Sequence, residues 1–330
     1  MRHMRVLGAE LVVRLLDMPS CIRAVERAFR DRGAGRPAPS AISGLELRDG
    51  GLHAKMASLE LSRPYVAVKV NANFPRNPVE HNLPTIQGLL VLFDGTNGVP
   101  LAVMDSGPLT TLRTAAASAV AASLLARPDA STATFIGCGV QARAHLEAIH
   151  LVRPLRRIVA VDARPAIAHE FSVLARRSLG VDVTVASSLA AATRESDIIV
   201  TTTPSRSPLL DVDDVSPGTF IAAVGTDSEH KQEIAPALLR VAAVVVDDLE
   251  QCARFGDLHH AIACGAMRRG DVRASLDQIV AGTRQGRLDD SEIVIFDSTG
   301  LAIEDVAAAA LVYERAAATV RRPTPRTSAS

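Results

Sequence analysis

The sequence lacks the features of several protein classes. Its four cysteines (Cys21, Cys138, Cys252 and Cys264) are scattered without CxxC spacing, so neither a disulfide framework nor a metal site is indicated. The chain also has no excess of positive or negative charge, because 36 basic residues balance 36 acidic ones. Such a balance argues against a nucleic-acid partner or an electrostatic membrane partner, since neither polyanion would be attracted.

Long apolar segments are absent too. No uninterrupted run reaches the ~18 apolar residues that a membrane span needs. Glu10, Arg14 and Asp17 interrupt the apolar N-terminal stretch, which argues against a signal peptide. We therefore expect a cytoplasmic protein.

Lysine is scarce, since only three of the 36 basic residues are lysines: Lys55, Lys69 and Lys231. A compact ammonium with a tunable pKa differs from the planar fork of arginine. A lysine retained in such an arginine-rich chain is therefore a candidate for a position where arginine cannot serve.

The segment 132–162, TATFIGCGVQARAHLEAIHLVRPLRRIVAVD, predicts a strand, a glycine turn, a helix and a second strand. Gly137 permits a tight turn, Gly139 lets the backbone approach a pyrophosphate, and Ala142 allows close packing of helix on strand. Asp162 follows the second strand, where an acid accepts hydrogen bonds from the adenosine ribose. This pattern predicts the first βαβ unit of a dinucleotide-binding domain.

The cofactor expected there is NAD. The negative charge of Asp162 would repel the 2′-phosphate of NADP, whereas Arg164 could accommodate that phosphate. NADP therefore remains possible.

The chain as a whole predicts an α/β protein of two domains. From residue 132 on, apolar strands alternate with helical segments, which is typical of a doubly wound parallel sheet. The first hundred residues instead predict helices followed by a mostly antiparallel sheet, with a hairpin at DGTNG (94–98) and a helix over 112–126. We expect a substrate and dimerisation domain from 1–125 and 304–320, a Rossmann domain at 126–303 and a disordered tail at 321–330.

Seven segments in fixed order carry a more specific signal. They are KVNANFPRN (69–77), LTTLRTAAASAVAA (109–122), GCGVQA (137–142), DIIVTTTPSRSPLL (197–210), AAVGTDSEHKQEI (222–234), GDL (256–258) and FDSTGLAIEDVAAA (296–309). Together they resemble the ornithine cyclodeaminase/μ-crystallin family. The resemblance implies a homodimer, NAD(P) as cofactor and hydride transfer at a carbon that bears an amino or imino group.

The resemblance also implies roles for individual residues. Arg113 would bind the substrate carboxylate with Lys69 beside it, and Asp227 would exchange a proton with the substrate nitrogen. Lys69 and Asp227 are thus the catalytic candidates. The remaining cofactor-binding candidates, some of them from the glycine turn, are Thr114, Gly137, Gly139, Val140, Gln141, Ala142, Asp162, Arg164, Thr202, Thr203, Gly225, Thr299 and Gly300, with Ser205 nearby.

Each of these residues also has a purely structural interpretation. Arg113 could form an ion pair at a helix start, Lys69 could be a solvated strand residue, and Asp227 could cap a loop. Lys231 could pair with Asp227 or with Glu233, and the spacing does not decide between them.

Two departures from the family pattern bear on the substrate. Ser40 stands where ornithine-handling members carry an arginine, and the stretch HAKMAS has Lys55 and no acid where they carry a glutamate. Nothing obvious is left to hold a distal ammonium, while Lys55 could contact a carboxylate or keto oxygen of the substrate.

These departures favour a reductase or dehydrogenase acting on a small L-amino acid and its imine. Two alternatives remain: an ornithine cyclodeaminase that recycles NAD, and a non-catalytic, μ-crystallin-like binding protein.

Overall fold

The computed structural model describes residues 4–321 and divides them into two compact units. Within the described residues, unit 1 comprises the chain up to residue 24, residues 37–113 and the chain from residue 302 on; unit 2 comprises residues 25–36 and 114–301. Residues 25–36 and 114–125 thus fall in unit 2, although the sequence-based division grouped them with the rest of 1–125. Of the tail predicted at 321–330, only Arg321 lies within the described residues, and it ends a helix.

Unit 1 is built on a six-stranded sheet with the order β1-β6-β5-β4-β3-β2. Only β1 and β6 pair in parallel, and the other neighbours are antiparallel, as the sequence predicted. The strands are β1 (Arg5–Leu7), β2 (Ser40–Leu47), β3 (Gly50–Glu60), β4 (Pro64–Asn73), β5 (Ile86–Asp94) and β6 (Pro100–Asp105).

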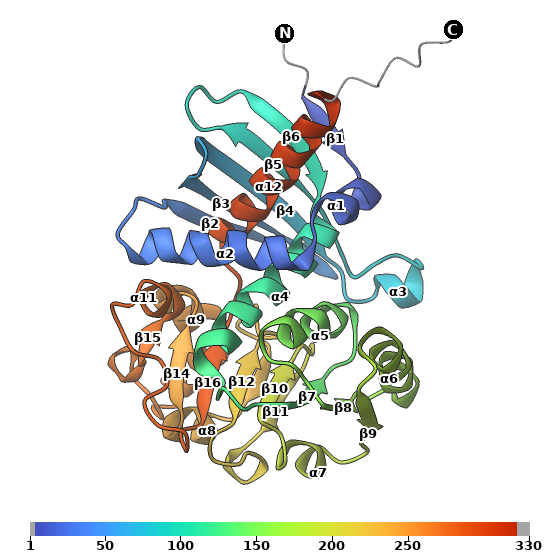
Figure 1. Ribbon diagram of the computed structural model, residues 1–330, viewed down its shortest axis with the longest axis vertical. Coiled ribbons are helices and arrows are strands. Elements are labelled where there is room, and N and C mark those ends of the chain that lie inside the picture. Colours follow the sequence, from blue (N-terminus) through green and yellow to red (C-terminus); the bar gives the residue numbers. More distant parts are fainter. Residues whose placement is uncertain (1–3, 322–330) are drawn as a thin grey trace, which may run out of the picture. The chain divides into compact units, whose positions relative to one another are not determined.

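One face of this sheet is covered by α12 (Ala302–Arg321), which packs on β3 and β4 (Figure 1). Along β4 the side chains of Tyr65, Ala67 and Lys69 alternate with more accessible neighbours and are buried, as the two-residue period of a strand requires. The other helices that begin in this part of the chain are α1 (Ala9–Leu15), α2 (Met18–Gly33), α3 (Asn77–Glu80) and α4 (Ser106–Leu125).

Helix α4 begins six residues earlier than the predicted start at residue 112. Gly107 and Pro108, which often mark loops, lie in its first turn, where proline costs no hydrogen bond because the first N–H groups are unpaired anyway. Arg113 therefore lies in the helix interior and not at its start. Along the chain, α4 passes from unit 1 into unit 2 after Arg113.

Unit 2 contains an eight-stranded parallel sheet with the order β15-β14-β16-β12-β10-β7-β8-β9. Four neighbouring strands, β10, β12, β14 and β16, are completely buried and almost entirely apolar, as expected of parallel strands that are covered on both faces. The strands are β7 (Thr132–Ile136), β8 (Arg157–Val161), β9 (Asp182–Val185), β10 (Ile198–Thr201), β12 (Phe220–Ala223), β14 (Ala243–Val246), β15 (Ala274–Ser275) and β16 (Val294–Asp297).

Helices alternate with these strands along the chain and flank the sheet (Figure 1). They are α5 (Val140–Val152), α6 (Pro165–Leu179), α7 (Leu189–Thr193), α8 (Pro236–Val241), α9 (Leu249–Phe255), α10 (Asp257–Ala263) and α11 (Leu276–Val280), while β11 (Arg206–Leu210) and β13 (Gln232–Ile234) form a separate two-stranded sheet. The predicted α/β fold is confirmed. None of the helices within residues 4–321 is both long and apolar enough to cross a membrane.

The strand order fixes where a ligand of unit 2 is expected. The chain runs outward from β7 through β8 and β9, then returns to the other side of β7 to form β10. In open parallel sheets such a switch point leaves a crevice outside the carboxyl ends of the strands, where ligands bind. The segments that follow β7 and β10 are the glycine turn and TTTPS, both of which the sequence singled out.

Candidate active site

The glycine turn after β7 has the geometry of a phosphate-binding turn. Gly137 has φ +83°, and a Cβ there would lie 2.9 Å from the carbonyl oxygen of Thr202, so only glycine fits. A Cβ on Gly139 would meet no atom within 4 Å, which leaves open space beside the start of α5. The first N–H groups of this helix have no partner within the helix and can bind an anion.

Asp162, at the end of β8, is tied to this turn. Its Oδ2 accepts a hydrogen bond from the backbone N–H of Cys138 at 2.9 Å, and its Oδ1 accepts one from the N–H of Arg164 at 2.9 Å. The carboxylate is only 11% exposed, whereas the Arg164 side chain is 76% exposed and its Nε lies 3.8 Å from Oδ1. Since a carboxylate can accept about four hydrogen bonds, Asp162 can hold the turn and still receive a ribose hydroxyl.

The first turn of α5 supports a ligand at the same place. The Oε1 atom of Gln141 is buried and has no hydrogen-bond partner among the described residues. Val140 is 68% exposed, whereas Ala142 is fully buried, as close helix packing requires. An unsatisfied buried oxygen is costly in the free protein, so a donor from a bound dinucleotide fits this site.

A buried carboxylate that the sequence analysis did not single out organises two cofactor candidates. Glu233 Oε1 accepts from the N–H of Thr203 at 2.6 Å, and its Oε2 accepts from the N–H of Gly225 at 2.8 Å and from the hydroxyl of Thr201 at 2.7 Å. The hydroxyl of Thr202 donates to the carbonyl of Gly137 at 2.8 Å. The segments after β7, β10 and β12 are thereby linked.

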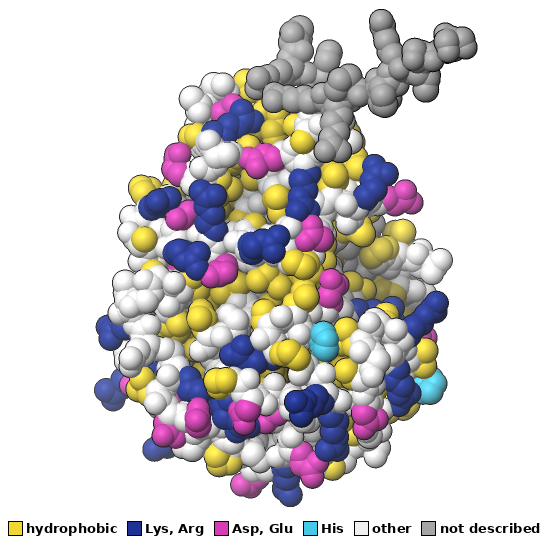
Figure 2. Space-filling model, viewed as in Figure 1, with side chains coloured by type: hydrophobic (Ala, Val, Ile, Leu, Met, Phe, Trp, Pro, Cys, Tyr) yellow, Lys and Arg dark blue, Asp and Glu magenta, His cyan; other side chains and the backbone are white. Residues whose placement is uncertain are grey.

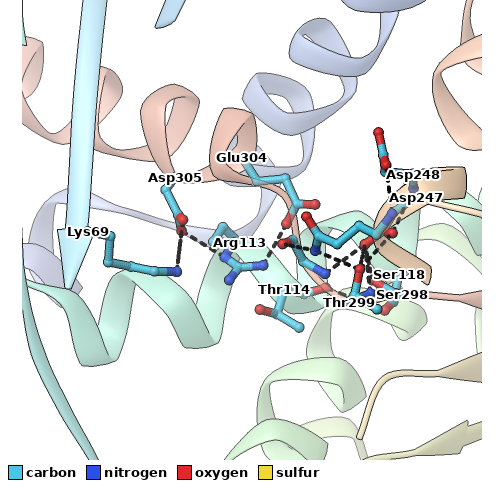
Figure 3. A network of polar contacts seen from close by, with 12 residues as sticks. Lys69, Arg113, Thr114, Ser118, Asp247, Asp248, Ser298, Thr299, Glu304 and Asp305 are labelled. Carbon is cyan, nitrogen blue, oxygen red and sulfur yellow. Dashed lines mark hydrogen bonds and ion pairs between the residues drawn. The ribbon is translucent and has the colours of Figure 1, made fainter. Parts of the chain in front are cut away.

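Asp247 organises two further cofactor candidates, Thr299 and Gly300, in the same way. Its Oδ2 accepts from the N–H groups of Thr299 and Gly300, each at 2.7 Å, and its Oδ1 accepts from the Thr299 hydroxyl at 3.1 Å (Figure 3). Gly300 has φ +77°, which favours glycine in this turn. Asp247 follows β14 and the turn follows β16, so the bonds join the carboxyl ends of two adjacent strands.

Two further buried acids, Asp257 and Asp297, complete the group in unit 2. Asp297 accepts from the N–H groups of Asp257 and Leu258, and Asp257 accepts from the N–H of Glu233 at 2.8 Å. Burial raises the pKa of Asp257 to about 6, and burial together with the charge of Asp257 raises the pKa of Glu233 to about 7. The backbone donors lower both values, but burial outweighs them.

Glu233, Asp257 and Asp297 lie in segments that the sequence analysis quoted, whereas Asp247 lies outside them. The available signal was their position, because Asp247 and Asp297 follow or end buried strands. The hydrogen bonds described above join residues that are 8 to 53 positions apart along the chain, and such pairings cannot be read from spacing.

Replacing Glu233 by glutamine is expected to raise the Kd for NADH about tenfold. An amide oxygen cannot accept all three hydrogen bonds, and about 1.4 kcal/mol is the size of one lost interaction of this kind. Fluorescence titration of NADH measures the effect, with Glu292→Gln, an acid bound to Arg273 elsewhere in unit 2, as the control. An unchanged Kd beside a lowered melting temperature would contradict a role in cofactor binding.

Two of the substrate candidates, Lys69 and Arg113, form a buried ion cluster with Asp305 and Glu304 (Figure 3). Lys69 Nζ lies 2.9 Å from Asp305 Oδ1 and 2.8 Å from Oδ2. Arg113 donates from Nε to Asp305 Oδ1 at 2.9 Å and from Nη1 to Glu304 Oε2 at 2.8 Å. Both acids lie in the first turn of α12, where the helix dipole favours negative charge.

The electrostatics of this cluster are strongly perturbed. Burial and the charges of Arg113 and Lys55 lower the pKa of Lys69 to about 7, although Asp305 opposes the shift. Burial would raise the pKa of Asp305, but the charges of Arg113 and Lys69 outweigh it and hold that pKa below its ordinary value. A lysine of this kind can exchange a proton near neutral pH.

The structure bears on the purely structural interpretations of Lys69, a solvated strand residue, and of Arg113, an ion pair at a helix start. Lys69 is not a solvated strand residue, since it is only 3% exposed. Arg113 forms the alternative ion pair, but as a residue of the helix interior that is 4% exposed. No hydrogen bond from its Nη2 to another described residue is found, and a guanidinium has five N–H donors. Donors therefore remain for a substrate carboxylate.

Asp227, two residues beyond Gly225, forms an ion pair with Lys231. The Lys231 ammonium donates to Asp227 Oδ1 at 2.6 Å, which decides between the two partners that the spacing allowed. The Asp227 side chain is 43% exposed, whereas that of Lys231 is 22% exposed. The carboxylate is thus accessible and held in place by a cation.

Two remaining cofactor candidates have local roles in unit 2. Thr114 is 8% exposed, and its carbonyl accepts from the Ser118 hydroxyl at 3.4 Å. Ser118 in turn contacts His145 Nε2 at 3.0 Å, which links α4 with α5. The hydroxyl of Ser205 lies 2.7 Å from the carbonyl of Ser207 and closes its own turn.

Comparison with known proteins identifies the family of this chain. Residues 2–320 match the model of the ornithine cyclodeaminase/mu-crystallin family. The chain belongs to this family. The expected resemblance is therefore confirmed over nearly the whole sequence.

Solved structures of full-length relatives share the fold. An archaeal alanine dehydrogenase dimer with bound NAD is 39% identical, with a TM-score of 0.92 over 98% of this chain and 99% of that chain. The Δ(1)-pyrroline-2-carboxylate reductase of Thermococcus litoralis, in complex with NADH and L-proline, is 34% identical, with a TM-score of 0.92 over 96% and 98%. The iminosuccinate reductase of Paracoccus denitrificans, in complex with NAD+, is 32% identical, with a TM-score of 0.89 over 97% and 98%.

Proposed function

We propose that this family member is an NAD-dependent enzyme that interconverts a small L-amino acid and its imine by hydride transfer at Cα. The observation that carries the proposal is the buried cluster of Lys69 and Arg113 on Asp305 and Glu304. Cationic donors held in a dry site are suited to bind a carboxylate. The same chain carries the glycine turn of a dinucleotide-binding unit.

The two cations of the cluster would hold the substrate by its α-carboxylate. The acids on α12 fix the direction of the Arg113 guanidinium, so little side-chain entropy remains to be lost when substrate binds. A bound carboxylate would also favour the protonated form of Lys69 and so raise its pKa from about 7. Lys69 could then serve both as a donor to the substrate and as a proton reservoir.

Asp227 would handle the proton at the substrate nitrogen. In the direction of reduction, the imine carbon accepts a hydride with its two electrons, and the nitrogen accepts one proton. In the direction of oxidation, the carboxylate takes that proton as the C=N bond forms. Lys231 donates to Oδ1 of this carboxylate and holds it in place until the substrate arrives.

The residues of the glycine turn, Asp162 and the segments held by Glu233 and Asp247 would bind the cofactor. Bound NADH supplies the hydride, and NAD+ accepts it in the reverse reaction. With this assignment, all cofactor-binding candidates between Gly137 and Gly300 serve to bind the dinucleotide. The three structural relatives, which carry NAD or NADH in their structures, support it.

The names of these relatives favour a reductase or dehydrogenase over the two alternatives. An ornithine cyclodeaminase would return the hydride to its own product and consume no NADH. A binding protein would bind ligands without turnover. The absence of an acid in the stretch that carries Lys55 argues against the cyclodeaminase, and the presence of Asp227 argues against the binding protein.

The test is to incubate the protein with NADH, ammonium and a panel of 2-keto acids and cyclic imines, while absorbance and product are followed together. We expect loss of NADH absorbance and formation of an L-amino acid. Proline formed from ornithine without net change in NADH would instead support the cyclodeaminase. Binding of NADH without any turnover would support the binding protein.

Asp162 should set the cofactor preference. Asp162→Ser is expected to lower kcat/KM for NAD relative to NADP by a factor equivalent to about 1–3 kcal/mol, because a hydrogen-bonded charge is lost. Arg164→Ala is the matched variant, which should affect NADP alone. If Asp162→Ser lowers kcat/KM for both cofactors equally, Asp162 only holds the turn.

The protein should also be a homodimer, through the face of the unit 1 sheet opposite to Lys69. Cross-strand pairing places six exposed apolar side chains on that face, and their exposed fractions range from 38% to 76%. Such a patch marks an interface in soluble proteins. The residues are Val6, Leu45, Leu47, Met56, Val70 and Leu89.

Light scattering at micromolar concentration is expected to give a dimer, and Leu89→Arg is expected to give a monomer because it buries a charge in the interface. Val79→Arg, at a 90% exposed position on α3, is the matched control and should remain dimeric. A monomeric wild-type protein would contradict the proposed assembly.

A further inference from the structure

One face of helix α4 is tied to strand β4 at two points, and Thr110 lies between them. Ser106, Thr110 and Arg113 follow at intervals of four and three residues, so they share one face of the helix. At one end of this face the Ser106 hydroxyl donates to Asn71 Oδ1 at 2.6 Å, and at the other end Arg113 and Lys69 bind the same acid of α12. Lys69 and Asn71 are two residues apart on β4 and therefore point to the same side of the sheet.

The hydroxyl oxygen of Thr110 is buried and makes no hydrogen bond with any residue in the described range 4–321. A threonine inside a helix can donate to the carbonyl four residues earlier. In this chain Thr111 does so to Gly107 at 3.0 Å, and Thr193 does so to Leu189 at 3.0 Å. A buried hydroxyl without a partner destabilises the free protein, so a ligand that accepts a hydrogen bond fits beside Thr110.

The groups next to this hydroxyl are the cations to which the proposed function assigns the substrate carboxylate. Arg113 lies three residues beyond Thr110, and residues spaced in this way are neighbours on a helix surface. Lys55 pairs with Lys69 in the register of β3 and β4, which places this further substrate candidate on the same face of the sheet. The two oxygens of a carboxylate together accept about four hydrogen bonds, so a hydroxyl can donate to a carboxylate that cations already bind.

We propose that the Thr110 hydroxyl donates a hydrogen bond to the α-carboxylate of the substrate, as a third ligand beside Arg113 and Lys69. The inference rests on the proposed function, in which these two cations bind that carboxylate. Every amino acid and imino acid carries the α-carboxylate, so Thr110 acts on all substrates alike, whatever their side chains. The carboxylate does not change during hydride transfer, and the contact therefore contributes to substrate binding and not to the chemical step.

The experiment measures KM and kcat of Thr110→Val in the full-length protein, with the two best substrates from the panel of keto acids and cyclic imines. Valine keeps the branched shape of threonine and lacks the hydroxyl. KM is expected to rise about 10–100-fold, by the same factor for both substrates, which is the range for a lost hydrogen bond to a charged group. The kcat should stay close to that of the wild type, because the contact is equally strong before and during the reaction.

The melting temperature and two further variants separate this role from packing. Without substrate, Thr110→Val should melt at the wild-type temperature or above it, since the substitution removes a buried hydroxyl that has no partner. Thr110→Ser keeps the hydroxyl and should have a KM close to that of the wild type. Thr111→Val is the matched control, because it removes a neighbouring hydroxyl that bonds within its own helix, and it should leave KM unchanged.

Four results would overturn the inference. An unchanged KM in Thr110→Val would assign the hydroxyl to packing alone, while the proposed function stands. Unequal factors for the two substrates would place the hydroxyl at the substrate side chain and not at the α-carboxylate. A loss in Thr110→Ser as large as that in Thr110→Val would assign the effect to the shape of the side chain. If the wild type turns over no keto acid or imine, the proposed function and this inference fail together.

Discussion

Replacing Asp227 by asparagine is expected to lower kcat by about 10²–10⁴-fold, the usual range for the loss of a general acid or base. The substitution keeps the size of the side chain and a group that can accept a hydrogen bond from Lys231, but it removes the basicity. Binding of NAD should stay nearly normal, because Asp227 is not among the residues assigned to the cofactor. Steady-state turnover of the best substrate and calorimetric binding of NAD measure the two effects.

Glu229→Gln is the matched control, because it removes the same charge two residues away on a side chain that is 59% exposed. It should retain kcat. If the Asp227→Asn protein retains most of its kcat as well, Asp227 serves only to anchor its loop through Lys231, and the proton must be handled elsewhere. Lys69, with its pKa of about 7, would then be the next candidate.

Replacing Arg113 is expected to lower kcat/KM by about 10²-fold or more, since a charge-assisted, two-pronged contact with the substrate carboxylate is lost. Arg113→Ala would also leave Glu304 and Asp305 buried with too little positive charge, which destabilises proteins by about 3–5 kcal/mol. Arg113→Lys is therefore the sharper variant, because it keeps the charge and removes the planar fork.

For Arg113→Lys we expect the full loss of kcat/KM with NADH affinity close to that of the wild type. Arg63→Lys, which alters the ion pair with Asp94 in the same unit, is the control for a general effect on stability. An Arg113→Lys protein with a lowered melting temperature but unchanged kcat/KM would assign Arg113 to structure alone.

Acidic and basic side chains are interspersed on the face of the molecule that Figure 2 shows, in keeping with the equal numbers of both in the sequence. The steering of substrate is therefore expected to depend on the local charges around Lys69 and Arg113 more than on a field of one sign.

The sequence predicted the fold well because local patterns determine it. The strands β7 (Thr132–Ile136) and β8 (Arg157–Val161) lie in the segment 132–162 on either side of a glycine turn and a helix, as predicted, since apolar runs bounded by loops define them. The strands β1 (Arg5–Leu7) and β15 (Ala274–Ser275) were not predicted. They have three and two residues, which is too short for a periodic signal.

The candidate site was predictable in part only. Gly137, Asp162 and Arg113 lie in recognisable motifs, but what holds them is distant in the sequence. Arg113 binds Glu304 and Asp305, 191 and 192 residues further along the chain. Single-sequence patterns carry no information on such pairs, so the acids that orient the cations were found only in the structure.

Transfer of a labelled hydride tests the central claim most directly. The protein is incubated with NADH deuterated at nicotinamide C4 on the transferred face, together with ammonium and the best keto acid or a cyclic imine. Mass spectrometry then locates the label in the amino acid product. We predict one deuterium at Cα for each NADH oxidised. An unlabelled amino acid product, or NADH that is bound but never oxidised, would contradict the account.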